Sequence, residues 1–144
     1  MEKSFRHILY TNMEERLEKI MILRFYKTIL IGKKRRLLIE FKENKYQILS
    51  TFLESDVSPF EEWIKSDFDR VISGESEYEE VNGNVCCAEI SPKTTKVYDN
   101  LAEDAMGNWC EVDTKELRQL IDEWCDKVQK FKMSITTKPP HRQA

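Results

Sequence analysis

Acidic side chains gather in two stretches of this 144-residue chain, and they are its most obvious candidates for chemistry. The first stretch runs from Glu75 to Glu80, and the second is the ten-residue segment from Asp99 to Asn108, which contains Glu103 and Asp104. Adjacent carboxylates can serve hydrolysis or hold a divalent metal ion, but the second stretch lacks the alternating carboxylates and central glycine of a calcium-binding loop. A concentrated negative surface can also attract a basic partner. It can equally be a solvated face that keeps a small protein in solution.

Trp109 lies next to the second acidic stretch and close to Met106. Aromatic and methionine side chains amid polar residues are typical of the centre of a protein interface, although the sequence alone favours a place in the core for Trp109. The candidate binding residues are Glu75, Glu77, Glu79, Glu80, Asp99, Glu103, Asp104 and Trp109.

The other reactive residue types do not form a recognisable catalytic or metal-binding set. The two histidines, His7 and His141, lie near the ends of the chain, and the four cysteines include no C-x-x-C pair. The sequence contains no histidine in the body of the chain that could act as a general base. It also contains no nucleophile motif, no glycine-rich phosphate loop and no metal-binding helix motif. We therefore expect a protein that is not an enzyme and that needs no metal or cofactor, with its cysteines reduced and buried.

Charge is strongly partitioned along the chain although the net charge is only −3. Residues 1–45 carry 12 basic and 6 acidic groups, residues 54–80 carry 10 acidic and 2 basic, and residues 99–126 carry 9 acidic and 2 basic. With 34% charged and 40% hydrophobic residues the chain is neither disordered nor membrane-spanning by composition. The sequence starts without a secretory signal, and its most apolar window is too short to cross a bilayer, so we expect a cytoplasmic protein with no membrane partner.

A basic run, Lys33 to Arg36, follows Gly32. It can be a nucleic-acid patch, or a set of cations favoured by the dipole at the end of a helix. We favour the second interpretation and expect no direct nucleic-acid binding, because no aromatic residues are interleaved to stack on bases.

Apolar spacing predicts that the first half of the chain is helical. A capping box at residues 12–15 opens a helix expected to run to Ile31, where Gly32 suits its end. Residues 35–55 fit a second helical stripe, although residues 37–41 can also form a short strand. A third helix is expected to start at Ser58, with proline and glutamate in the next positions of the cap motif, and to end at Gly74.

The pattern changes after Gly74. Residues 78–81 and 84–90 predict two strands joined by an Asn82-Gly83 turn with positive φ, and residues 96–98 and 109–112 predict two more. Asp113 is expected to cap a helix whose apolar stripe extends from Leu117 to Phe131. Residues 134–144 carry no apolar pattern and are expected to be a disordered tail.

These elements predict one α+β domain over residues 1–133, with N-terminal helices, a small central antiparallel sheet and a capped amphipathic helix at the C-terminus. Three segments of residues 78–124, about a third of the chain, resemble small bacterial immunity proteins encoded beside polymorphic toxins, including those of contact-dependent growth inhibition systems. The segments are residues 82–86, 95–100 and 108–117, closing at residues 121–124.

The resemblance implies a non-enzymatic antitoxin that binds one cognate toxin domain, frequently a nuclease. Our first hypothesis is therefore an immunity protein that neutralises a basic nuclease domain through the acidic candidate residues. The alternative is a small nucleic-acid-binding or regulatory module that uses Lys33 to Arg36.

Overall fold

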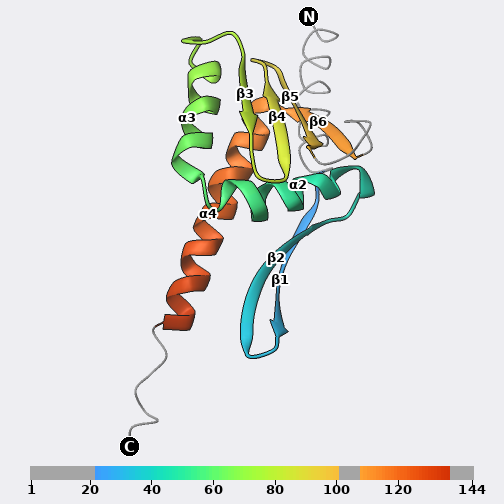
Figure 1. The fold of residues 1–144 in the computed structure, drawn as a ribbon, viewed down its shortest axis with the longest axis vertical. Helices are drawn as coiled ribbons and strands as arrows, with labels where there is room; N and C mark the ends of the chain where they lie inside the picture. The colour runs from blue at the N-terminus through green and yellow to red at the C-terminus, as the bar shows by residue number, and fades with distance from the viewer. Residues whose placement is uncertain (1–21, 101–107, 137–144) are drawn as a thin grey trace, which may run out of the picture.

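A computed structural model describes residues 22–100 and 108–136 (Figure 1). The strands are β1 (Arg24–Ile31), β2 (Lys34–Phe41), β3 (Glu79–Asn82), β4 (Cys86–Ile90), β5 (Thr94–Asp99) and β6 (Trp109–Asp113). The helices are the short η1 (Asn44–Tyr46), α2 (Gln47–Thr51) and η2 (Phe52–Val57), followed by α3 (Glu61–Ile72) and α4 (Thr114–Thr136). The fold is α+β with two antiparallel sheets, as the fold class predicted. No described helix is long and apolar enough to cross a membrane.

The first two strands form a separate hairpin and correct the prediction of N-terminal helices. Residues 24–31 are strand β1, not the end of a helix, and they pair along their whole length with β2, from Arg24 opposite Phe41 to Ile31 opposite Lys34. Residues 37–41 are therefore strand, the option that the sequence had left open. The predicted capping box at residues 12–15 lies outside the described residues.

Gly32 has φ +64° in the two-residue turn of this hairpin. A glycine at positive φ is favoured both after a helix and in a tight hairpin turn. Gly32 therefore fitted the predicted helix end, but it lies in a hairpin turn.

One face of the hairpin packs on α4. Tyr26 stacks on Trp124 with the ring centroids 6.4 Å apart, and Ile39 and Phe41 are buried in the core. The Arg24 guanidinium donates two hydrogen bonds to Glu123, at 2.6 and 2.8 Å, and the Tyr26 hydroxyl donates a third to the same carboxylate. Two strands alone are marginally stable in water, so this packing is what holds the hairpin in place.

The predicted helix over residues 35–55 is confirmed only in its second half. Helical structure begins at Asn44, and α2 continues into η2, a π-helical turn that reaches Val57. Their buried hydrophobic residues are Ile48, Leu49, Phe52, Leu53 and Val57, which belong to the core.

Helix α3 begins later than its sequence motif indicated. Its first residue is Glu61, and Phe60 stands at the N-cap position without a side-chain capping bond. Ser58 is not the cap, because its hydroxyl instead accepts a hydrogen bond from the Trp124 indole at 2.9 Å. The predicted end is confirmed, since Gly74 has φ +88° directly after the helix.

Strands β3 to β6 form an antiparallel meander in the order β3-β4-β5-β6, which confirms the four predicted strands. The predicted turn at Asn82-Gly83 is wrong in type, because Gly83 has no positive φ. A Cβ atom at Gly83 would lie 2.5 Å from Cγ and Oδ1 of Asp56. Glycine is required there by the close approach of a buried carboxylate.

Helix α4 starts as predicted. The Asp113 carboxylate accepts the Glu116 backbone N–H at 2.9 Å, which is an N-cap bond. The buried stripe consists of Leu117, Leu120, Ile121 and Trp124, with Val128 and Phe131 partly buried beyond it. The helix continues to Thr136, so the tail does not begin at residue 134; residues 137–144 lie outside the described part.

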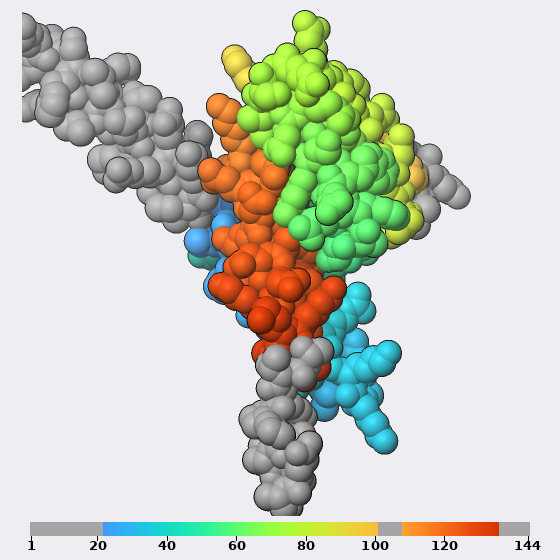
Figure 2. Space-filling view, turned by 90° about the vertical axis from the view of Figure 1, so that its left-hand side faces the viewer, coloured from blue at the N-terminus to red at the C-terminus, as the bar shows by residue number. Residues whose placement is uncertain are grey.

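Helices α2, α3 and α4 all contact the four-stranded sheet on one face, and the core lies between them. The hairpin and the last turns of α4 reach away from this body at one end, while α3 and β3 lie at the other (Figures 1 and 2).

Candidate functional site

The strand register divides the four-stranded sheet into two faces. Val81, Ala88, Val97 and Cys110 stand in one cross-strand row, and all four are buried against the helices. Because side chains alternate along a strand, the rows on either side of this one point away from the helices. We call that surface the outer face; its side chains are Glu80, Asn82, Cys87, Glu89, Lys96, Tyr98, Trp109 and Glu111.

One row of the outer face consists of charged residues. Glu80 pairs with Glu89, Glu89 with Lys96, and Lys96 with Glu111, so three carboxylates and one ammonium group cross all four strands. The Glu111 carboxylate also accepts a hydrogen bond from the Thr94 hydroxyl at 3.2 Å. Like charges directly opposite each other oppose pairing, so Glu80 and Glu89 lower the stability of the sheet.

The second row of the outer face contains two aromatic side chains and consists of Asn82, Cys87, Tyr98 and Trp109. Trp109 is 43% exposed, and the Lys96 ammonium lies 4.9 Å from the centroid of its ring. Tyr98 stands beside Trp109 in register on the neighbouring strand. Tyr78, just before β3, is also exposed, and burial together with Glu89 and Glu80 raises its pKa. Exposed aromatic rings surrounded by carboxylates are the composition expected of an interface centre with a charged rim.

Cys87 and Tyr98 close the middle of this face. The Cys87 thiol donates a hydrogen bond to Oδ1 of Asn82 at 3.1 Å and is buried. Burial raises the pKa of Cys87, and burial followed by hydrogen bonding to Cys87 raises that of Tyr98. Both groups therefore stay neutral near pH 7, and the charge of this face is set by its glutamates and Lys96.

The structure separates the glutamates that the sequence had grouped together. Glu80 belongs to the outer face, but its neighbour Glu79 points to the opposite side and lies 3.4 Å from the Arg70 guanidinium of α3. Hydrogen bonds from Ser76 and Arg70 lower the pKa of Glu79. Because Arg70 also pairs with the buried Asp67, Glu79 is part of the contact between α3 and the sheet.

The remaining candidate residues are spread over different places. Glu75 and Glu77 are exposed in the connection between α3 and β3, and Glu75 lines a surface hollow that also contains Arg70 and Arg118. Asp99 ends β5 in register with Cys86, so by alternation it does not belong to the outer face. Glu103 and Asp104 lie outside the described residues. Of the eight candidates, the outer face contains Glu80 and Trp109.

Glu89, Lys96, Tyr98 and Glu111 were not among the candidates, although they flank Glu80 and Trp109 in the sheet. The signal that could have identified them is strand alternation. Once residues 84–90, 96–98 and 109–112 are read as neighbouring strands, every second side chain falls on one face.

The cysteines at positions 86, 87, 110 and 125 are all free thiols, and Cys86, Cys87 and Cys110 are buried. Within residues 22–100 and 108–136, no group of three or more histidine, cysteine, aspartate or glutamate residues is arranged to hold a metal ion. The arrangement that the described residues do offer is a charged and aromatic surface suited to contact with another macromolecule.

Comparison with known proteins gives one informative relative. A protein of Bacillus cereus named "Immunity protein" is 46% identical to this chain over 86 residues, which is 60% of this chain and 74% of the relative. No family model matches the chain. No solved structure matches it either.

Proposed function

This chain belongs to the family of the Bacillus cereus immunity protein, and from that membership we propose that it binds and neutralises a cognate bacterial toxin domain. The identity of 46% across 74% of the relative is the observation that carries the proposal. In this proposal the protein works in the cytoplasm by occupying the toxin, without performing a reaction of its own. The toxin belongs to a polymorphic toxin system of the contact-dependent growth inhibition type.

The outer face is our proposed docking surface for the toxin. It combines three carboxylates, Glu80, Glu89 and Glu111, with the exposed ring of Trp109. In this proposal the toxin domain is a nuclease. A nuclease must attract phosphate groups and therefore carries a basic substrate surface, which the acidic outer face complements. Steering by the carboxylates would speed association, and burial of the aromatic ring would slow dissociation.

Co-purification with the product of the neighbouring toxin gene tests the function itself. Both genes would be expressed together, and the toxin domain is expected to remain bound to the protein and to lose its toxicity. If cells are killed equally with and without this protein, and no complex is recovered at low salt, the proposed function is wrong.

Paired variants test the surface. Glu80→Lys with Glu89→Lys is expected to slow association by about tenfold or more at low salt, and by less at high salt. The control is Glu62→Lys on α3, an exposed carboxylate outside the outer face, which should leave the association rate close to that of the unchanged protein.

Two tryptophans of nearly equal exposure give a second matched pair. Trp109 is 43% exposed on the outer face, and Trp63 is 44% exposed on α3, where it packs edge-on against Phe60. Trp109→Ala is expected to weaken toxin binding by about thirtyfold, the size of an interface hot spot, and Trp63→Ala to change it little. Equal losses for the two variants would mean that the outer face is not the docking surface.

A further inference from the structure

The end of the molecule formed by the hairpin and the last turns of α4 combines positive charge with exposed aliphatic side chains. We define the basic tip as residues 28–37 and 130–135. These two segments contain six lysines and arginines and no aspartate or glutamate. The basic residues are Lys33, Lys34, Arg35, Arg36, Lys130 and Lys132.

Exposed apolar surface is concentrated at the same end. Among the described residues nine large hydrophobic side chains are exposed, and six of them lie in or beside the hairpin or at the end of α4. At the tip itself Leu30 is 67% exposed, Ile31 56% and Ile135 41%. Aliphatic side chains exposed to this extent, and surrounded by cations, add nothing to the core and mark a contact site.

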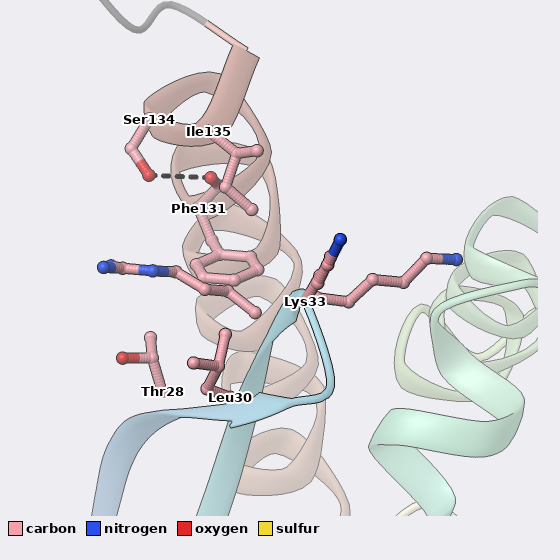
Figure 3. A pocket seen from close by; sticks show the side chains of 8 residues that line it. Thr28, Leu30, Lys33, Phe131, Ser134 and Ile135 are labelled. Carbon is pink, nitrogen blue, oxygen red and sulfur yellow. Dashed lines mark hydrogen bonds between the residues drawn. The ribbon is translucent and has the colours of Figure 1, made fainter.

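The tip is also hollowed. A groove of about 730 Å³ lies between the two segments; Leu30 lines it from the hairpin, and Phe131 and Ile135 line it from α4. Figure 3 shows these three apolar side chains along the groove, with Lys33 at the turn of the hairpin beside them. Lys34 and Arg35 complete the basic border.

Few carboxylates oppose this charge within the described structure. Lys130 pairs with Asp126 at 3.1 Å, but both side chains are exposed, so the pair is weak. Glu54 lies in a neighbouring hollow with Arg35 and Arg36, where it accepts the Ile39 backbone N–H. The turn of the hairpin lies at one end of the molecule (Figure 1).

We propose that the basic tip docks the protein on an anionic lipid bilayer, with the cations on the headgroup phosphates and Leu30, Ile31 and Ile135 inserted between them. Clusters of four to eight basic residues bind anionic leaflets, each contributing about a fivefold gain in affinity. Aliphatic side chains beside them add burial in the interfacial region. The proposal departs from the expectation of no membrane partner, which rested on the lack of a crossing segment, because docking at a bilayer surface needs no such segment.

The aliphatic character of the tip favours a bilayer over nucleic acid. Proteins that bind single-stranded nucleic acid stack bases on aromatic rings. At the tip the exposed apolar side chains are those of Leu30, Ile31, Met133 and Ile135, none of them aromatic, and the aromatic ring of Phe131 is partly buried in the groove. The proposal is independent of toxin binding, and it would place the protein at the membrane that an incoming toxin has to cross.

Vesicle sedimentation with the full chain tests the proposal, using phosphatidylcholine vesicles with and without about a third of phosphatidylglycerol. The protein is expected to pellet with the anionic vesicles and not with the neutral ones, and to be released as the salt concentration rises. Failure to bind anionic vesicles at low salt would overturn the proposal whether or not the protein binds a toxin.

Charge variants locate the contact. Lys33→Glu with Lys34→Glu is expected to lower the vesicle partition coefficient by roughly thirtyfold or more, at about fivefold for each positive charge lost. Lys93→Glu with Lys115→Glu is the control, because it makes the same change of net charge at exposed lysines near the four-stranded sheet. An equal loss in the control would show that net charge alone determines binding.

The double variant Leu30→Ser with Ile31→Ser distinguishes binding to a bilayer from binding to nucleic acid. Both side chains are more than half exposed, so the fold should persist, and circular dichroism checks this. Vesicle binding is expected to fall by roughly tenfold. Binding of a labelled single-stranded RNA should not change. If vesicle binding is unaffected by these serines, and the RNA binds more tightly than the vesicles, the tip is a nucleic-acid site and the proposal is wrong.

Discussion

The contact between Asp56 and the β3–β4 connection gives the most specific prediction about stability. Asp56 lies in the π-helical turn η2 and is fully buried. Its carboxylate accepts the backbone N–H groups of Asn84, Val85 at 3.1 Å and Cys86 at 2.8 Å. Three backbone donors from one connection therefore hold this carboxylate in the core.

The cost of removing this carboxylate follows from the burial of its partners. Asp56→Ala leaves the Cys86 donor without an acceptor in the core, at a cost of about 1–3 kcal/mol, while the more exposed Asn84 and Val85 donors can turn partly to water. Together the three lost bonds should lower the free energy of unfolding by about 3–5 kcal/mol. That is a large fraction of the ~5–15 kcal/mol typical of a domain.

Gly83 supplies the second arm of a double-mutant cycle. Gly83→Ala places a Cβ 2.5 Å from Cγ and Oδ1 of Asp56 and 3.0 Å from its Cβ. Forcing this contact should cost about 1–3 kcal/mol, because the carboxylate is fixed by its hydrogen bonds. Combining the two substitutions removes the two shortest contacts, so the double variant should be about 1–2 kcal/mol more stable than the sum of the single effects predicts.

Urea unfolding of the two single variants and the double variant, followed by circular dichroism, measures these values. Asp126→Ala, at an exposed aspartate of α4, is the control and should cost less than about 1 kcal/mol. Additivity within about 0.5 kcal/mol would refute the reasoning, because it would mean that Asp56 and Gly83 do not share the contact described above.

Three further predictions concern single residues. The hydrogen bond from Arg24 lowers the pKa of Glu123 from its ordinary value of 4.5. The ionised carboxylate therefore stabilises the fold above pH 4.5, and this stabilisation is lost as the pH falls through the lowered pKa. The thermal midpoint of Glu123→Gln should therefore fall less than that of the unchanged protein on acidification below pH 4.5, and parallel curves would contradict this. Asp113→Ala removes the N-cap bond to Glu116 and should cost about 1 kcal/mol in urea unfolding, with Asp113→Asn retaining most of it. Gly32→Ala forces a side chain into φ +64° and should lower stability by about 1–2 kcal/mol, whereas no change in the denaturation midpoint would mean that the turn adopts another conformation.

The C-terminal half of the fold could be predicted because its signals are local. Asp113 caps α4 through its own neighbouring backbone, and the apolar stripe from Leu117 to Trp124 repeats at the helical period. Each of the four short strands carries aromatic or β-branched residues between turns, and sequential strands pair with their neighbours in a meander. Such features need information from only a few adjacent residues.

The hairpin could not be predicted in the same way, because its strands gain their stability from distant residues. Tyr26 packs on Trp124, and Arg24 binds Glu123, almost a hundred residues later in the chain. The apolar residues of β1 also lie on both of its faces, since Phe25 and Ile31 are exposed opposite the packed side. Without alternation the segment fitted a helical stripe equally well, and only burial against α4 decides for a strand.

The sequence alone determined that two acidic stretches and a basic run exist, since charge is read directly from residue type, but it did not decide that Trp109 is exposed. Tertiary structure decided which of them meet. Strand alternation places Glu80 beside Glu89 on the outer face and directs Glu79 to Arg70. The sequence predicted that Lys33 to Arg36 follow a helix end. In the structure they belong to the β1–β2 hairpin and lie at its tip beside α4. A surface is a property of strand pairing and packing between distant segments, and those contacts are not encoded in any one stretch of the chain.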